Sequence, residues 1–154
     1  MELIGPELRR EAECEAVLRT LPEWFGIEEA LLQYARDSAV LPTFAFEDAS
    51  RLVGFVSLRE HFPESWEVNC IAVTATLRNQ GLGTRLLDHA EAWVAARGAR
   101  LLQVKTLAAS AGDPHYEQTR AFYLRRGYVP VEVFPTLWSP KNPALMLIKA
   151  LETD

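Results

Sequence analysis

The chain of 154 residues has the length of one domain, and its 49% of apolar residues is enough to form one core. Its net charge of -5, with no polybasic patch, argues against nucleic acid as the main partner. No apolar run approaches the roughly 18 residues of a membrane span, and the acidic N-terminus does not resemble a signal peptide. We therefore expect a single domain over residues 1–154, without a membrane partner.

The cysteines and histidines predict neither a disulfide framework nor a metal site. Cys14 and Cys70 lie far apart in apolar patterns, which is typical of reduced core thiols in a cytoplasmic protein. His61, His89 and His115 are isolated and show no metal-ligand spacing, so we expect no metal.

The first part of the chain predicts a short strand and two amphipathic helices. Residues 2–5 are the strand candidate, and Pro6 is expected to open a helix whose apolar positions recur at helical spacing up to Leu21. The segment LPEWFG ends this helix. A second helical pattern then runs from Ile27 to Asp37.

Three strands follow, at residues 40–46, 52–58 and 66–73. The linkers EDASR and REHFPES are short and polar, as antiparallel hairpins require. Next comes a helix with one apolar face and with Gly98 as the residue after its C-terminus. That face is formed by Leu82, Leu86, Leu87, Ala90, Trp93 and Val94.

The rest of the chain predicts a strand at 101–107, a helix over HYEQTRAFYLRR and two closing strands at 128–134 and 144–151. The segment PTLWSPKNP, with three prolines, is expected to be a loop between the last two strands. A helical crossover from 66–73 to 101–107 implies that these two strands are parallel neighbours. The sheet is therefore predicted to be mixed, with helices on both faces.

The stretch RNQGLG, residues 78–83, places two glycines and an arginine directly before a helix. Gly81 and Gly83 lack Cβ atoms, so a ligand can approach the backbone closely. The first N–H groups of a helix have no intrahelical partner and lie at its positive end, where a pyrophosphate fits. Arg78 adds a fixed charge. Taken alone, the pattern fits an ordinary strand-to-helix turn equally well, and it matches neither a Walker loop nor GxGxxG.

Together with a second segment, this turn resembles the GNAT superfamily of acyl-CoA-dependent N-acyltransferases. RNQGLG fits the family's Gln/Arg-x-x-Gly-x-Gly/Ala pattern, and AFYLRRGY, residues 121–128, resembles its late helix, with an aromatic-Tyr pair four residues before Gly-Phe or Gly-Tyr. The order of elements resembles the family over nearly the whole chain. Many members carry Asn seven residues before the helix tyrosine, where this chain has Tyr116, so the contact made by that Asn must come from elsewhere or be absent.

The resemblance implies the GNAT fold, an α/β (α+β) architecture with one mixed, mostly antiparallel sheet and a parallel strand pair that splays apart. It implies acetyl-CoA as co-substrate, with its pyrophosphate on the backbone N–H groups of residues 79–84 and its pantetheine arm paired with Ile71 and Val73. The Ile71 N–H would face the thioester oxygen. The implied cofactor-binding residues are Ile71, Ala72, Val73, Arg78, Asn79, Gln80, Gly81, Leu82, Gly83, Thr84, Tyr116 and Tyr123.

Acyl transfer to an amine requires a base for the ammonium and an acid for the departing thiolate. The resemblance makes Tyr123 the candidate acid, because the family places this tyrosine near the CoA sulfur. Glu67 is the candidate base, since histone acetyltransferases of the family carry a glutamate fourteen residues before the glycine turn. Because side chains alternate along a strand, Asn69 and Ile71 are expected on the same face of the strand as Glu67.

Several alternatives to this base stay open. An equally good interpretation of Glu67 is a solvated carboxylate at the end of a strand, paired with a neighbour such as Arg59. Glu60 and His61 are rival bases acting through water, and many family members use a water chain with no dedicated base.

The acceptor site is expected between the two N-terminal helices and the loop joining the last two strands. Trp24, Phe25 and Trp138, with Leu137 beside it, are candidates for an apolar or cation-binding wall. Such aromatics more often close the core. The acidic residues Glu23, Glu28 and Glu29 would attract a cationic amine, but acids are favoured at a helix N-terminus in any case.

These residues predict an N-acetyltransferase that moves an acetyl group from acetyl-CoA to a primary amine of a small molecule or a peptide, by direct attack in a ternary complex. One alternative is an acyltransferase for protein lysines, N-termini or longer acyl chains. Another is a non-catalytic acyl-CoA-binding module on the same fold. A homodimer is a further possibility.

Overall fold

The computed structural model describes residues 1–152. Two short 3-10 helices, Ala75–Leu77 and Ala109–Ala111, lie in connections. The strands and α-helices are, in chain order, β1 (Glu2–Ile4), α1 (Glu11–Arg19), α2 (Glu28–Val40), β2 (Thr43–Asp48), β3 (Arg51–Phe62), β4 (Ser65–Val73), α3 (Leu82–Ala96), β5 (Leu101–Leu107), α4 (Pro114–Arg125), β6 (Val129–Ser139) and β7 (Asn142–Ala150).

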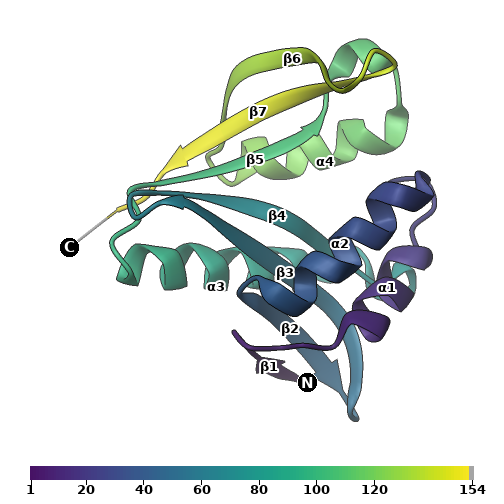
Figure 1. Cartoon of the computed structure of the whole chain (residues 1–154), viewed down its shortest axis with the longest axis vertical. Coiled ribbons are helices and arrows are strands. Elements are labelled where there is room, and N and C mark those ends of the chain that lie inside the picture. Colours follow the sequence, from purple (N-terminus) through teal and green to yellow (C-terminus); the bar gives the residue numbers. More distant parts are fainter. Residues whose placement is uncertain (153–154) are drawn as a thin grey trace.

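The seven strands form one sheet in the order β1-β2-β3-β4-β5-β7-β6. The β4–β5 pair is parallel and every other neighbouring pair is antiparallel, which confirms the predicted mixed sheet. Figure 1 shows β4 and β5 starting side by side and then diverging. The sheet is thus split into two wings that share one end.

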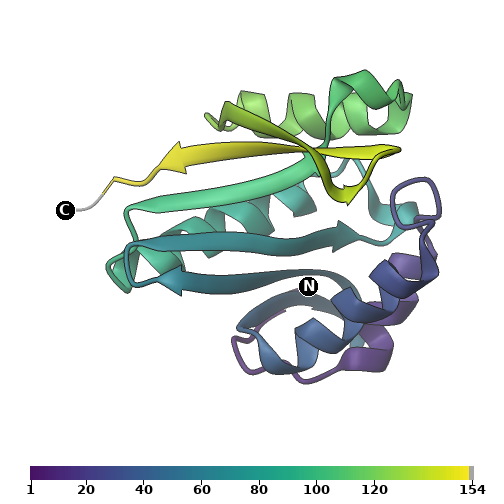
Figure 2. The same cartoon turned by 45° about the horizontal axis from the view of Figure 1, so that its top comes forward.

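Helices cover both faces of the sheet (Figure 2), and each face has its own apolar core. On one face, Leu86 and Val94 of α3 pack with Val68 and Leu102 of the central strands. On the other face, Leu18 of α1 packs with residues of β3 and α2. The apolar face predicted for the α3 segment is confirmed, with Trp93 packed at its margin. Each large side chain buried here contributes about 1.5–3 kcal/mol.

A β-bulge in β4 changes which face of the sheet its residues reach. Ser57 of β3 is opposite Cys70, but the next residue, Leu58, is opposite Val68, so Asn69 is an extra residue in β4. Val68 belongs to the core under α3, whereas Cys70 belongs to the core under α1. In a regular strand, residues two apart share a face.

The bulge makes one expectation wrong. Ile71 packs against the α3 core, away from the side of Asn69, which bonds Asp37 on α2. Glu67, Asn69 and Ile71 therefore do not share one face.

Several element boundaries also differ from the predictions. The strand predicted at 40–46 is β2, which begins only at Thr43 because α2 continues to Val40, and β3 continues to Phe62 through most of the predicted linker REHFPES. The first helix begins at Glu11, because Arg9 has a φ of 51° and Pro6 O accepts a hydrogen bond from Thr43 N at 2.8 Å. The segment predicted as a loop after residue 134 is mostly strand, since β6 runs to Ser139 and the turn to β7 takes only residues 140 and 141. Proline is tolerated there because β6 lies at the edge of the sheet.

Candidate active site

The separation of β4 from β5 leaves one edge of β4 without a strand partner. The parallel register runs from Ser65–Leu101 to Val68–Val104 and stops there, while β4 stays paired with β3 as far as Val73. A cavity of about 970 Å³ lies along this edge, between residues 68–73 of β4 and residues 104–106 of β5. The backbone groups on this edge of β4 are therefore available to an extended ligand.

The cavity continues to the glycine turn at the start of α3. Asn79 and Gly81 both have positive φ, 63° and 83°, and α3 begins at Leu82. No described side chain caps this helix, and a Cβ on Gly81 would meet no described atom within 4 Å. By contrast, α4 is capped by Asp113, which accepts a hydrogen bond from His115 N at 2.9 Å. The start of α3 therefore has the free N–H groups and the space that a pyrophosphate needs.

Arg78, at the entry of this turn, is stacked on Trp24 of the α1–α2 connection. Its guanidinium carbon lies 3.9 Å from the centroid of the Trp24 ring. Burial lowers the pKa of Arg78, but a guanidinium stays charged at any physiological pH. The Trp24 Nε1 donates to His115 O at 3.2 Å and to Thr119 Oγ1 at 3.1 Å. The hydroxyl of Tyr116 donates to Trp24 O, so the α1–α2 connection is anchored on α4.

A second cation reaches the start of α3 from the end of α4. Arg126 Nε donates to Thr84 Oγ1 at 3.1 Å, and its guanidinium lies 4.8 Å from the centroid of the Phe122 ring. Both arginines line the cavity. No role for Arg126 was predicted from the sequence, where the only signal is a second basic residue directly after Arg125 at the end of the helix.

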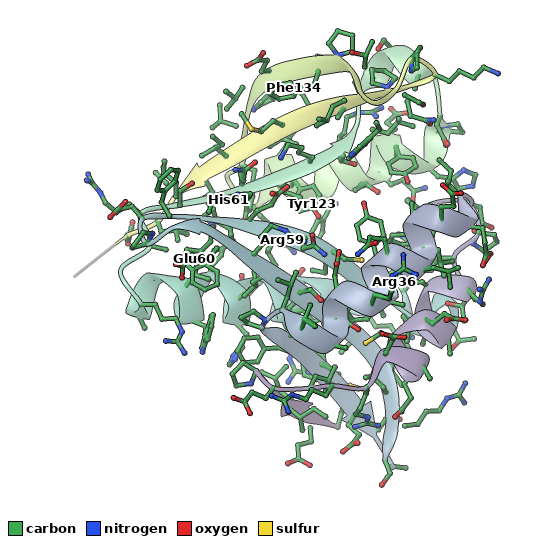
Figure 3. The ribbon with its side chains drawn as sticks, in the orientation of Figure 1. Arg36, Arg59, Glu60, His61, Tyr123 and Phe134 are labelled. Carbon is green, nitrogen blue, oxygen red and sulfur yellow. The ribbon has the colours of Figure 1, made fainter. Side chains whose placement is uncertain are left out.

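Tyr123 of α4 is 3% exposed and lines the cavity across from β4. Figure 3 shows it on the side of α4 toward β4. Burial raises the pKa of Tyr123 well above the usual value for tyrosine, and it also raises the pKa of Tyr34 of α2. Burial likewise raises the pKa of Tyr116 to about 12, and it raises the pKa of the Cys70 thiol well above its usual value. The cavity therefore holds neutral phenols and a neutral thiol.

Glu67 has both carboxylate oxygens bonded. His61 Nε2 lies 2.7 Å from Oε1, and Lys105 Nζ donates to Oε2 at 3.0 Å. Arg59 lies opposite Glu67 in the β3–β4 register, yet its side chain bonds Asn69 at 3.4 Å and pairs with Asp37 at 3.6 Å. Glu67 therefore does not pair with Arg59, which was the alternative considered from the sequence. It pairs instead with Lys105 of the parallel neighbour β5.

The cavity brings together most of the residues named from the sequence. Its lining includes Trp24, Phe25, Ile71, Ala72, Val73, Arg78, Asn79, Gly81, Leu82, Gly83, Thr84, Tyr116, Tyr123 and Trp138. Gln80 and Glu67 lie outside this lining, but Lys105, which donates a hydrogen bond to Glu67, is part of it. Of the aromatic candidates, Phe25 packs edge-on against Tyr34, and Trp138 is 45% exposed.

Comparison with known proteins places the chain in a family. The family model for the acetyltransferase (GNAT) family matches residues 7–128, which include the glycine turn and the helix of Tyr123. The chain belongs to the GNAT acetyltransferase family. No curated protein sequence matches this GNAT chain significantly.

Solved structures share its fold at low sequence identity. One, described as an acetyltransferase of the GNAT family from Desulfovibrio desulfuricans, has a TM-score of 0.81 and 16% identity, covering 98% of this chain and 99% of that one. An aminoglycoside 6'-N-acetyltransferase complexed with coenzyme A has a TM-score of 0.78 and 19% identity, covering 100% and 99%. Ard1 from Thermoplasma volcanium has a TM-score of 0.75 and 15% identity, covering 99% of each chain. These likenesses confirm the GNAT fold.

Within residues 1–152 of the GNAT chain, no helix is long and apolar enough to cross a membrane. That part of the chain also contains no group of three or more His, Cys, Asp or Glu side chains arranged to hold a metal ion.

Proposed function

We propose that this GNAT protein transfers an acetyl group from acetyl-CoA to a primary amine, by direct attack within a ternary complex. The observation that carries the proposal is the continuity between the unpaired edge of β4 and the uncapped start of α3, along one cavity. A ligand with an extended amide-containing arm and a diphosphate matches these two features in order. Acetyl-CoA is such a ligand, and here it is a substrate.

The residues that would hold acetyl-CoA divide into two groups. The N–H groups of residues 79–84 would receive the diphosphate, with Arg78 and Arg126 supplying charge nearby. The backbone of Ile71 and Val73 would pair with the pantetheine arm, as a strand would. The Ile71 N–H would then donate to the thioester oxygen, where negative charge builds up during attack.

The acceptor must lose a proton before it attacks. An alkyl ammonium has a pKa of about 10.4, so only about one molecule in a few thousand is neutral near pH 7. We assign the base role to Glu67, whose Oε1 is 2.7 Å from His61 Nε2. The His61 side chain is 38% exposed, compared with 15% for Glu67, so His61 links the carboxylate to solvent. This arrangement combines Glu67 and His61, which the sequence left as rivals, in one proton path.

Tyr123 would protonate the departing thiolate. Its raised pKa keeps it protonated, as an acid must be before the reaction. A thiolate held in the same desolvated cavity also has its pKa raised, which brings donor and acceptor closer in proton affinity. Cys70 remains a neutral thiol, a poor nucleophile, which supports direct attack over an acyl-enzyme.

The test is a CoA-release assay over a panel of amines, with acetyl-CoA binding measured separately by calorimetry. The panel contains aminoglycosides, small diamines, amino acids and peptides with a free lysine or N-terminus. We expect saturable turnover with at least one amine. Binding of acetyl-CoA without turnover on any of them would favour the non-catalytic module. Faster turnover with longer acyl-CoAs, or with peptides alone, would favour the other acyltransferase alternatives.

A further inference from the structure

Lys105 occupies the point where β4 and β5 separate. It follows Val104, the last residue of β5 with a partner in β4. Its Nζ donates to Glu67 Oε2 and to Gln103 Oε1, both at 3.0 Å. The Lys105 side chain is 21% exposed and lines the cavity, whereas Glu67 is not among the residues that line it. A primary amine of the protein is thus hydrogen-bonded to the carboxylate that we assign as the base.

The surroundings of this amine are those that an acceptor amine would need. Ile71 and Tyr123, proposed to contact the thioester and its sulfur, line the same cavity. Glu67 Oε2 can take a proton from Lys105 Nζ directly, because these two atoms are already at hydrogen-bond distance. Holding the two reacting groups in one cavity replaces a bimolecular encounter by an intramolecular one.

We propose that Lys105 is itself acetylated at Nζ by acetyl-CoA bound in this cavity. The inference rests on the proposed function, since it needs acetyl-CoA in place. Of the three protons of the ammonium, one passes to Glu67 and through His61 to solvent. The nitrogen lone pair attacks the thioester carbonyl carbon, the N–C bond forms and the C–S bond breaks. A second proton reaches the thiolate as free CoA thiol, by way of Tyr123, and the third stays on the amide nitrogen.

The modification changes the charge beside Glu67. The acetylated side chain has one N–H donor and no positive charge, so Glu67 loses its ion-pair partner across the sheet. Glu67 Oε2 would then be released to receive a cationic acceptor amine, while Oε1 stays bonded to His61. Self-acetylation at Lys105 would therefore alter the acceptor end of the cavity.

The chain contains its own controls, because it has three lysines. Lys149 is matched to Lys105 in burial and pairing. It is 28% exposed and donates to Glu91 Oε1 at 2.8 Å, but it does not line the cavity. Lys141 lies in the exposed turn between β6 and β7 and reports uncatalysed acetylation.

The experiment incubates the folded protein with carbon-13-labelled acetyl-CoA and follows each lysine by peptide mass spectrometry. We expect Lys105 to be labelled about a hundredfold faster than Lys149, and E67Q to slow Lys105 labelling by a similar factor without changing Lys141. Circular dichroism verifies that E67Q is folded. Urea-unfolded protein should label all three lysines at similar rates.

The outcomes separate this inference from the proposed function. Calorimetric binding of acetyl-CoA with turnover of an amine, but with no preferential label on Lys105, overturns the inference alone. Labelling of Lys105 that is unchanged in E67Q also overturns it, since chemical reactivity would then be the cause. Failure of the folded protein to bind acetyl-CoA overturns both.

Discussion

The guanidinium of Arg78 lies 3.9 Å from the ring centroid of Trp24, so the glycine turn and the α1–α2 connection meet at one contact. Trp24 is in turn bonded to α4 through His115 and Thr119. Three segments far apart in the sequence therefore determine where the charge of Arg78 lies. The position of the positive charge next to the start of α3 depends on this arrangement.

Replacing Trp24 by Leu is expected to weaken acetyl-CoA binding by about tenfold, because Arg78 loses a stacking contact of about 0.5–2 kcal/mol that orients it. Isothermal titration calorimetry measures the change. The matched control is Trp93→Leu, since Arg97 stacks on Trp93 at 4.0 Å and neither residue lines the cavity. Equal weakening in both variants would show that general destabilisation, not the position of Arg78, is responsible.

Gly81→Ala separates the backbone strain of the turn from its binding role. Gly81 and Gly98 both have positive φ, 83° and 95°, and a Cβ on either would meet no described atom within 4 Å. Alanine at either position should thus cost about 1–2 kcal/mol of stability. Acetyl-CoA affinity should fall only in Gly81→Ala, whose Cβ would enter the proposed diphosphate site. Thermal unfolding and calorimetry measure the two effects, and an affinity loss of the same size in Gly98→Ala would contradict this role of the turn.

The raised pKa of Tyr123 makes a prediction about alkaline pH. The protonated phenol is the active acid, and it is lost only as pH rises through a pKa above the usual value of about 10. The acceptor amine becomes more reactive over the same range as it loses its proton. Turnover should therefore rise steadily from pH 6.5 to about 9.5 without a descending limb.

Tyr123→Phe provides the matching variant. It should lower kcat by about a hundredfold with little change in acetyl-CoA affinity, because only the hydroxyl is removed. Stopped-flow turnover and calorimetry together measure this split. A parallel loss of turnover and affinity would remove the acid role of Tyr123.

The base role of Glu67 predicts a loss of turnover when its carboxylate is removed. Glu67→Gln should lower kcat/KM by about tenfold to a hundredfold across the pH range in which the wild type is active. Profiles of wild type, Glu67→Gln and Glu60→Gln measured with one amine make the comparison. An unchanged profile in Glu67→Gln, with the loss appearing in Glu60→Gln, would transfer the base role to the exposed neighbour.

Much of the architecture was predictable because it depends on local patterns. Helical spacing of apolar residues predicted the face of α3 that enters the core, and a helical crossover predicted the parallel β4–β5 pair. Proline content misled at β6, since Pro135 lies in a strand at the sheet edge, Pro140 lies in the turn, and Pro143 lies near the start of β7. The position of a strand within the sheet is not a local property.

The sequence by itself determined the glycine turn, the helix tyrosine and the order of elements, since each depends on residue types close together in the chain. Only the tertiary structure decided what Glu67 contacts and which way Ile71 points. Lys105 and His61 reach Glu67 from two different strands, and their meeting depends on strand register. One extra residue, Asn69, reverses the faces of β4 beyond it. A bulge arises from the pairing of two strands, so the alternation within one strand could not predict it.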